Sequence, residues 1–320
     1  MRRLTLASFL VSFASAFALL LVASQNAGTG AASSSVSCGD TITTDTTLTS
    51  DLTDCVGNGL IISSDNITLD CQGHTIDSDG SGSYGIVVGG RSWDTIKNCV
   101  VTDFLYGISL SESSNITLTD NTANSNGFGF FVINSSSNTL TGSTANGNLY
   151  DGIHLWNSSS NTLSGSTMRD NGGVGLSLMG SDNLIYNNYF SSPQNAGASG
   201  TNTWNVGKTP GTNIIGGPYL GGNYWSDYTG VDTNGDGLGD TGLPYNSNGN
   251  IQNGGDYAPL ATPSAPLPVG GIAELPDVAG AHFEGSGSSG RSTGTLVGLA
   301  AGGVLAFTAG AWYAKRRWLR

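Results

Sequence analysis

Basic side chains are scarce in this sequence of 320 residues, which contains 11 Lys and Arg against 23 Asp and Glu. Six of the basic residues lie at the two ends of the chain, so the part between them carries about 5 − 23 = −18 charges. Proteins that bind nucleic acid need clustered Lys and Arg to neutralise phosphates. A nucleic-acid partner is therefore not expected, whereas an acidic exterior suits cations and a salty medium.

Long apolar runs are absent except at the two ends. Residues 1–32 have a basic start, an apolar run and small residues, which predicts a signal peptide cleaved around residues 24–32, with an uncleaved anchor as the alternative. Residues 293–313 are long and apolar enough to span a bilayer, and the basic tail at 314–320 should stay cytoplasmic. The sequence thus predicts an exported chain held on the extracytoplasmic face of the cell membrane by one C-terminal helix.

Cysteine is also scarce, with 4 residues and no C-x-x-C pair, which argues against a zinc ribbon. In an exported chain, four cysteines point to disulfides, for which three connectivities exist.

Glycine, by contrast, is abundant, with 49 residues, and it recurs in register with apolar residues. A marker glycine precedes an apolar alternation five times, with spacings of 22, 22, 23 and 23 residues, at Gly85, Gly107, Gly129, Gly152 and Gly175. The residues one and three positions after each marker are large and apolar, which is typical of a strand with one buried face. These pairs are Ile86 and Val88, Ile108 and Leu110, Phe130 and Val132, Ile153 and Leu155, and Leu176 and Leu178.

A second, Thr-rich segment repeats with the same period. Its apolar positions are Leu69, Ile96, Leu118, Leu140, Leu163 and Ile185, and all but the first are followed five residues later by Val101, Ala123, Ala145, Met168 and Phe190. A polar column, Asn121, Ser143, Ser166 and Asn188, can hydrogen-bond along a stack. Asn126, Asn148 and Asn171 precede the next marker, and Asn and Gly tolerate the left-handed conformation that corners require.

A repeat of about 22 residues without helical periodicity cannot bury a core alone, so its copies must stack on one another. We therefore predict an all-β fold, a parallel β-helix over residues 33–205, with equivalent side chains of successive coils about 4.8 Å apart. The register places Cys71 and Cys99 near one corner of adjacent coils, which favours a disulfide between them. Cys38 then pairs with Cys55 at the entry to the helix, where a first coil needs a cap.

Beyond residue 205 the period is lost and aromatic residues become frequent, which predicts a C-terminal cap at 206–260 with a small core of its own. Residues 261–292 are rich in Pro, Gly and Ser and are predicted to be a flexible linker.

Several segments resemble a known family. DNITLDCQGHTI (65–76), DTIKNC (94–99) and especially GGNYWSDYTGVDTNGDGLGDTGLPY (221–245) are similar to the right-handed parallel β-helix proteins of the periplasmic copper-binding NosD type. That family belongs to the wider pectin-lyase-like group of carbohydrate-binding proteins and sugar hydrolases. The resemblance covers residues 38 to about 260 and implies a right-handed helix. The copper that the family name implies needs soft ligands or imidazoles, and these are few and unpaired here, so we set copper binding aside.

The segment DTNGDGLGD has the alternating oxygen ligands with which a loop wraps Ca²⁺. The predicted ligands are Asp232, Asn234, Asp236, the Leu238 carbonyl and Asp240, with Asp227 and Asp256 as further candidates. The loop is not a complete EF-hand, because its twelfth position is Leu243 rather than Glu. A structural calcium ion that holds the cap is expected here, and an empty acidic turn is the alternative.

Large side chains are expected on the outward side of the strands that follow the marker glycines. Phe131, His154 and Trp156 fall on adjacent coils, where exposed rings on a rigid sheet can stack on sugar rings, unless a loop covers them. A second aromatic series, Tyr84, Tyr106, Phe128 and Tyr150, is assigned to packing.

An enzyme of the same fold is the main alternative. Glycoside hydrolysis needs two carboxylates about 5 to 9.5 Å apart, and a lyase needs a cation or base beside an acidic sugar. The aligned columns do not stack carboxylates, and Asp70 and Lys97 are expected to form an ion pair between neighbouring coils. We therefore expect a structural or carbohydrate-binding module without catalysis, whose partners are the membrane and surface glycans. The alternatives are a polysaccharide hydrolase or lyase and a NosD-like accessory protein for metal-site maturation.

Overall fold

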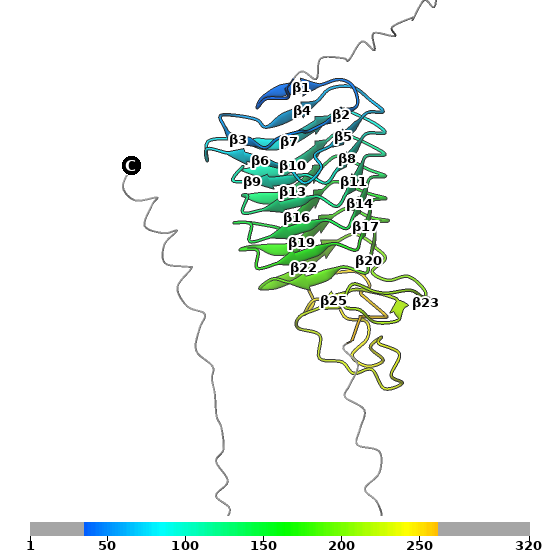
Figure 1. Cartoon of the computed structure of the whole chain (residues 1–320). Helices are drawn as coiled ribbons and strands as arrows, with labels where there is room; N and C mark the ends of the chain where they lie inside the picture. Colours follow the sequence, from blue (N-terminus) through cyan, green and yellow to red (C-terminus); the bar gives the residue numbers. More distant parts are fainter. Residues whose placement is uncertain (1–34, 262–320) are drawn as a thin grey trace, which may run out of the picture. The chain divides into compact units, whose positions relative to one another are not determined.

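The computed structural model describes residues 35–261, which form an all-β parallel solenoid of about 7 turns with coils of about 22 residues (Figure 1). The predicted signal peptide, transmembrane helix and basic tail, and all but the first residue of the predicted linker, lie outside the described residues. Among the described residues, no helix is long and apolar enough to cross a membrane.

Each coil contributes one short strand to each of three parallel sheets. The first sheet consists of β1 (Asp40–Ile42), β4 (Leu60–Ile62), β7 (Tyr84–Gly89), β10 (Tyr106–Ser111), β13 (Phe128–Ile133), β16 (Ile153–Trp156), β19 (Val174–Met179) and β22 (Gln194–Ser199). The second consists of β2 (Thr46–Thr47), β5 (Thr68–Asp70), β8 (Thr95–Lys97), β11 (Thr117–Thr119), β14 (Thr139–Thr141), β17 (Thr162–Ser164) and β20 (Leu184–Tyr186). The third consists of β3 (Leu52–Cys55), β6 (Thr75–Ser78), β9 (Val100–Thr102), β12 (Thr122–Asn124), β15 (Thr144–Asn146), β18 (Thr167–Arg169), β21 (Tyr189–Ser191) and β25 (Tyr224–Trp225).

The core consists of files of identical or similar side chains that run through the coils. Strand pairing aligns one inner file of the first sheet without a gap, and all its members are buried: Ile86, Ile108, Phe130, Ile153 and Leu176. The predicted files of the second and third sheets are aligned and buried in the same way. The prediction of stacked coils is confirmed. Each buried Leu, Ile or Phe contributes about 1.5–3 kcal/mol relative to an exposed position.

The marker glycines are required by crowding. A Cβ at Gly85 would lie 2.1 Å from the Val101 side chain, and one at Gly107 would lie 2.6 Å from the Gly129 carbonyl oxygen. The register is unbroken across this residue, since Tyr84 pairs with Tyr106 and Ile86 with Ile108. Glycine is therefore needed for close packing, and no side chain larger than hydrogen fits there.

The predicted polar column is confirmed. The backbone N–H of Cys99 donates to the Asn121 side chain at 3.0 Å, and the same bond continues from coil to coil through Ser143 and Ser166 to Asn188. Buried backbone groups at the corners need such partners because no water reaches them.

The interpretation of Asn126, Asn148 and Asn171 as left-handed corner residues is wrong. The left-handed residue is the one before each of them, namely Ser125, Gly147 and Asp170. The three asparagines are instead buried and stack as a second amide ladder, in which the Asn126 N–H donates to Asn148 at 2.9 Å and the Asn148 N–H donates to Asn171 at 3.0 Å.

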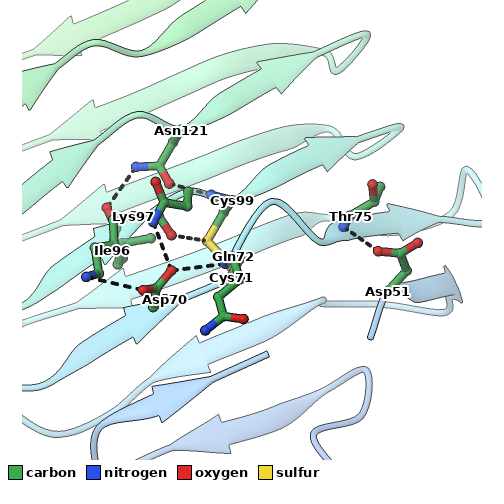
Figure 2. Close-up of a disulfide and its surroundings, with 10 residues drawn as sticks. Asp51, Asp70, Cys71, Gln72, Thr75, Ile96, Lys97, Cys99 and Asn121 are labelled. Atoms are coloured by element: carbon green, nitrogen blue, oxygen red, sulfur yellow. Dashed lines mark hydrogen bonds and ion pairs between the residues drawn. A yellow bond between two sulfur atoms is a disulfide. The ribbon is translucent and has the colours of Figure 1, made fainter. Parts of the chain in front are cut away.

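Both predicted disulfides are present. Cys38 bonds to Cys55 with a Cα–Cα distance of 5.4 Å, and Cys71 bonds to Cys99 with one of 4.7 Å. Figure 2 shows the second disulfide beside the predicted ion pair, in which the Lys97 ammonium lies 3.2 Å from the Asp70 carboxylate. Hydrogen bonds to Asp70, first from the Asn98 side chain and then from the Gln72 backbone, lower the pKa of this carboxyl.

The segment after the last coil caps the open end of the solenoid. Its strand β25 extends the third sheet by pairing with β21, and β23 (Thr209–Pro210) pairs with β24 (Tyr219–Leu220) in a small antiparallel sheet. Trp204 and Trp225 are buried against the end of the core. The buried Asp256 carboxylate accepts hydrogen bonds from Asn223, from the Trp225 indole and from the Ala258 N–H.

Candidate functional site

The outward side of the first sheet carries the large side chains that the sequence predicted. Phe131 of β13 pairs with His154 of β16, and Ile133 pairs with Trp156. Along each strand these residues alternate with residues that point inward, because successive side chains of a strand point to opposite faces. The Phe131 and His154 rings stack at 5.3 Å, and the His154 and Trp156 rings lie parallel with centroids 6.0 Å apart.

The second aromatic series lies on the same outer face and contacts the first. Its rings follow one another at 5.1, 5.5 and 5.0 Å, in the order Tyr84, Tyr106, Phe128 and Tyr150. Phe131 lies 4.6 Å from the Tyr106 ring and 5.4 Å from the Phe128 ring. Tyr84, Tyr106 and Phe128 are half-buried, which agrees with a packing role, whereas Tyr150 at the end of the series is exposed. The contact with Phe131 was not foreseen, since it joins two series that the sequence analysis treated separately.

Trp156 is one of two exposed rings on this surface, the other being Tyr150, which is 46% exposed. The Trp156 side chain is 45% exposed, whereas Phe131 and His154 are half-buried beneath their neighbours. Met179, the next residue of the same file on β19, is 41% exposed. No loop of the described chain covers this part of the first sheet. We call Trp156, Met179 and the neighbouring Asn134, Asn157 and His154 the Trp156 surface.

A hydrogen-bonded pair of side chains supports the middle of this surface. His154 Nδ1 lies 2.8 Å from Asp151 Oδ2, and the other Asp151 oxygen accepts the Val174 N–H at 2.9 Å. The carboxylate therefore fixes the imidazole ring and leaves Nε2 directed away from it. Periodicity does not indicate this pair, because Asp151 precedes β16 and only His154 belongs to the alternation of that strand.

Two amides border Trp156 at the end of the strands. Asn134 directly follows β13 and its N–H donates to the Trp156 carbonyl, and Asn157 follows β16. The Asn157 amide nitrogen donates to the Asn134 side-chain oxygen at 2.8 Å. This bond orients both amides and leaves one donor group and one acceptor oxygen of the pair for other partners.

The predicted calcium loop is held by hydrogen bonds of its own. The Asp232 carboxylate accepts backbone N–H groups from four of the next five residues, including Gly235 at 2.7 Å and Gly237 at 2.6 Å. Asp236 is 2.6 Å from the Lys208 ammonium. Asp240 accepts from Thr233 and Asn234.

These contacts do not match a calcium cage in this arrangement. Within residues 35–261, no three His, Cys, Asp or Glu side chains are grouped as metal ligands. The Leu238 N–H bonds to Asp236, and the two further candidates accept other bonds, Asp227 from Asn195 of β22 and Asp256 from Asn223. Calcium binding stays a prediction that would require Asp236 to leave Lys208.

Four further aspartates lie at corners. Asp103, Asp120, Asp170 and Asp182 all adopt the left-handed conformation there, as turn residues do. A shallow hollow of about 400 Å³ is lined by Gln72, Gly73, Asn98, Val100 and Asp120. It lies beside the Cys71–Cys99 disulfide, away from the aromatic residues, and it contains a single carboxylate, so we give it no role.

Solved structures with partial similarity act on alginate. The chain is 21% identical to a mutant of the periplasmic alginate epimerase AlgG over 47% of this chain and 37% of that one, with a TM-score of 0.41. It is 15% identical to the alginate lyase from Paenibacillus sp. str. FPU-7 over 51% and 67% of the two chains, with a TM-score of 0.26. It is 15% identical to the mannuronan C-5 epimerase AlgE4 A-module of Azotobacter vinelandii over 44% of this chain and 57% of that one, with a TM-score of 0.24.

The chain therefore spans only about a third of the length of the AlgG structure. No curated protein matches it. Residues 24–230 match the family described as periplasmic copper-binding protein (NosD), as the coil and cap motifs implied. The periplasmic description and the two disulfides are consistent with an extracytoplasmic location. The match covers well over half of the sequence, and the chain belongs to the NosD family.

Proposed function

We propose that this protein is a right-handed β-helix displayed outside the cell, anchored by its C-terminal helix, and that the Trp156 surface binds carbohydrate. The observation that carries the proposal is the exposed Trp156 ring on a rigid sheet, supported from below by stacked rings. Sugar rings have apolar faces that pack against aromatic rings, while their hydroxyls need hydrogen-bond partners at the edge. The amides of Asn134 and Asn157 and the His154 Nε2 supply such partners.

Rigidity favours binding by this surface. Trp156 is positioned by parallel pairing with β13 and β19 on both sides, so its strand has no free edge. A ligand that binds a preorganised surface loses less affinity to the ordering of protein side chains. A structural or ligand-binding role fits such a site without any catalytic step.

The test is a glycan array probed with the full chain in detergent, in the wild-type form and as Trp156→Ala. Binding should fall roughly tenfold in the variant, which corresponds to about 1.4 kcal/mol. Trp93→Ala is the matched control, because Trp93 is 65% exposed but lies at a corner outside the first sheet. Equal binding by all three proteins, or an absence of binding to every glycan, would remove the proposal.

A polysaccharide-active enzyme is the second candidate function, and the Asp151–His154 pair favours it. An imidazole held by a carboxylate and directed at a bound sugar is placed to act as a general base. Incubation of the full chain with polysaccharides, followed by assays for new reducing ends and for unsaturated products, decides between the two functions. We expect no product, because within residues 35–261 no third His, Cys, Asp or Glu side chain is grouped with this pair. Turnover that His154→Ala abolishes would establish the enzyme instead.

A further inference from the structure

The charge of the protein restricts which carbohydrate the Trp156 surface accepts. We propose that the ligand is an uncharged linear polysaccharide and that polyuronates are excluded. This inference rests on the proposed function and names its ligand class. It differs from what the alginate-acting structures would suggest.

Binding of a polyuronate requires cations that pair with its carboxylates. Residues 35–261 contain four Lys and Arg, and each already has a partner. The contacts are Arg91 with Asp65 at 3.7 Å, Lys97 with Asp70 at 3.2 Å, Lys208 with Asp236 at 2.6 Å, and Arg169 over the Tyr189 ring at 5.7 Å. Lys97 and Arg169 belong to the other two sheets and Lys208 to the cap, so Arg91 alone lies next to the first sheet.

Arg91 is also held in place. Its guanidinium donates to the carbonyl oxygens of Gly89 and Ser63 at 3.1 and 3.2 Å. Gly89 is three coils away from Trp156 in the same file, since Gly89 pairs with Ser111, Ser111 with Ile133 and Ile133 with Trp156. A carboxylate bound at Trp156 would therefore lie about 14 Å away from Arg91, beyond the screening length at physiological salt.

A carboxylate lies beside the Trp156 surface. Asp151 holds the neighbouring His154 ring, and residues 35–261 as a whole carry 4 − 20 = −16 formal charges. Like charges brought together at a binding surface cost several kcal/mol and slow the encounter. A uronate carboxylate at this surface would thus be repelled, whereas an uncharged sugar would not.

The polar groups at the surface suit hydroxyls. The Asn134–Asn157 pair offers an amide donor and an amide acceptor, and a hydroxyl can serve both at once. A carboxylate can only accept, so it can use the amide donor of the pair but not the acceptor oxygen of Asn157. The amide pair therefore suits a hydroxyl better than a carboxylate.

The file that contains Trp156 follows the stack of coils. Ile133, Trp156 and Met179 lie on β13, β16 and β19, which Figure 1 shows in succession along the first sheet. Successive strands are about 4.8 Å apart, so the three side chains present a strip about 10 Å long. This strip can support consecutive sugar units of one linear chain laid along the axis of the solenoid.

The experiment measures binding of the full chain to immobilised β-glucan, mannan, alginate and polygalacturonate, at salt concentrations from about 0.05 to 0.5 M. We expect binding to at least one uncharged polymer, a loss of tenfold or more in Trp156→Ala, and little change with salt. Alginate and polygalacturonate should bind at least tenfold more weakly. EDTA is present throughout, so that calcium cannot bridge two carboxylates.

A variant with an added positive charge tests the same inference in the opposite direction. Met179→Lys places an ammonium beside Trp156 and should gain alginate binding that disappears at high salt. Wild-type binding of alginate as tight as that of the uncharged polymers, or no gain in Met179→Lys, would overturn the inference and leave the proposed function standing. If Trp156→Ala binds every polymer as the wild type does, the proposed function fails and the inference fails with it.

Discussion

At the scale of single residues, Asp94 stands at a position where later coils have a buried asparagine. It occupies the position that Asn138, Asn161 and Asn183 hold in later coils, since Thr95, Thr117, Thr139 and Thr162 pair in register. One carboxylate oxygen accepts the Ile67 N–H at 3.1 Å, and the other is buried without a hydrogen bond. Burial raises the pKa of this carboxyl.

The first prediction is that Asp94→Asn stabilises the protein. Asn restores the amide donor that later coils use at this position, and it removes a buried group without a partner, a defect that costs about 1–3 kcal/mol. Because the pKa of Asp94 is raised in the folded state, the protonated carboxyl is the form that favours folding. This contribution to stability is complete below about pH 3.8 and is lost as the pH rises through the folded-state pKa. Urea unfolding at pH 7 should show the gain, and the gain should shrink at pH 4. A less stable variant at pH 7 would contradict this.

Asp256 is a buried carboxylate with a different environment. Burial raises its pKa to about 6, against the hydrogen bonds from Asn223, Trp225 and Ala258 that favour the charged form. In the unfolded chain the same carboxyl has a pKa near 3.8. Between about pH 4 and 6 the native state therefore holds this proton, whereas the unfolded chain has lost it.

The second prediction is a pH dependence carried by Asp256. Its contribution to the free energy of unfolding should fall by about 3 kcal/mol as the pH rises from below 4 through 6. The measurement compares wild type with Asp256→Asn in urea from pH 4 to 7. The variant is expected to lack this falling component, and parallel profiles for the two proteins would refute the assignment.

At the scale of elements, strand alternation on β13 places two adjacent phenylalanines on opposite faces. Phe130 belongs to the inner file and is buried, whereas Phe131 lies half-buried on the outer face. Phe130→Ala should therefore cost about 3–5 kcal/mol of stability. Phe131→Ala, as the matched control, should cost less and should loosen His154 and Trp156. If chemical denaturation shows similar losses of stability in both variants, the burial of the inward-facing residue is not what stabilises the coil.

The cap loop allows a test of the remaining calcium prediction. If Ca²⁺ binds at Asp232, Asp236 and Asp240, it competes with the Lys208 ammonium, so Lys208→Gln should raise calcium affinity. The unfolding temperature should then rise on adding calcium in place of EDTA, and rise further in the variant. Unchanged unfolding temperatures in both proteins would show that the hydrogen bonds of the loop suffice to hold it.

The sequence predicted the coils and both disulfides because each file repeats at a fixed period. Equal spacing of Ile86, Ile108 and Phe130 determines which residues stack, whatever the local geometry. Asn148 shows the limit of that reasoning. Its turn propensity suggested a left-handed corner, but only the stacked coils reveal that its amide is buried and paired above and below.

The site was predicted less completely than the fold. Phe131, His154 and Trp156 were found because they share the register of the inner file. The support from Tyr106 and the Asp151–His154 pair depends on side-chain contacts between different positions of the coil, which periodicity does not describe. The cap has no repeat, so the hydrogen bonds of Asp227 and Asp256 could not be derived from the sequence.

At the scale of the whole molecule, the stack of coils converts a polar, Gly-rich chain into a support for one exposed aromatic surface. The central claim is that ligand binds on the first sheet at Trp156 and not on the cap. Hydrogen exchange of the full chain, with and without the uncharged polymer that binds best and with alginate for comparison, tests this directly. The account predicts added protection confined to residues 128–134, 153–157 and 174–179, while protection confined to the cap at 206–260, or the same protection from alginate, would contradict it.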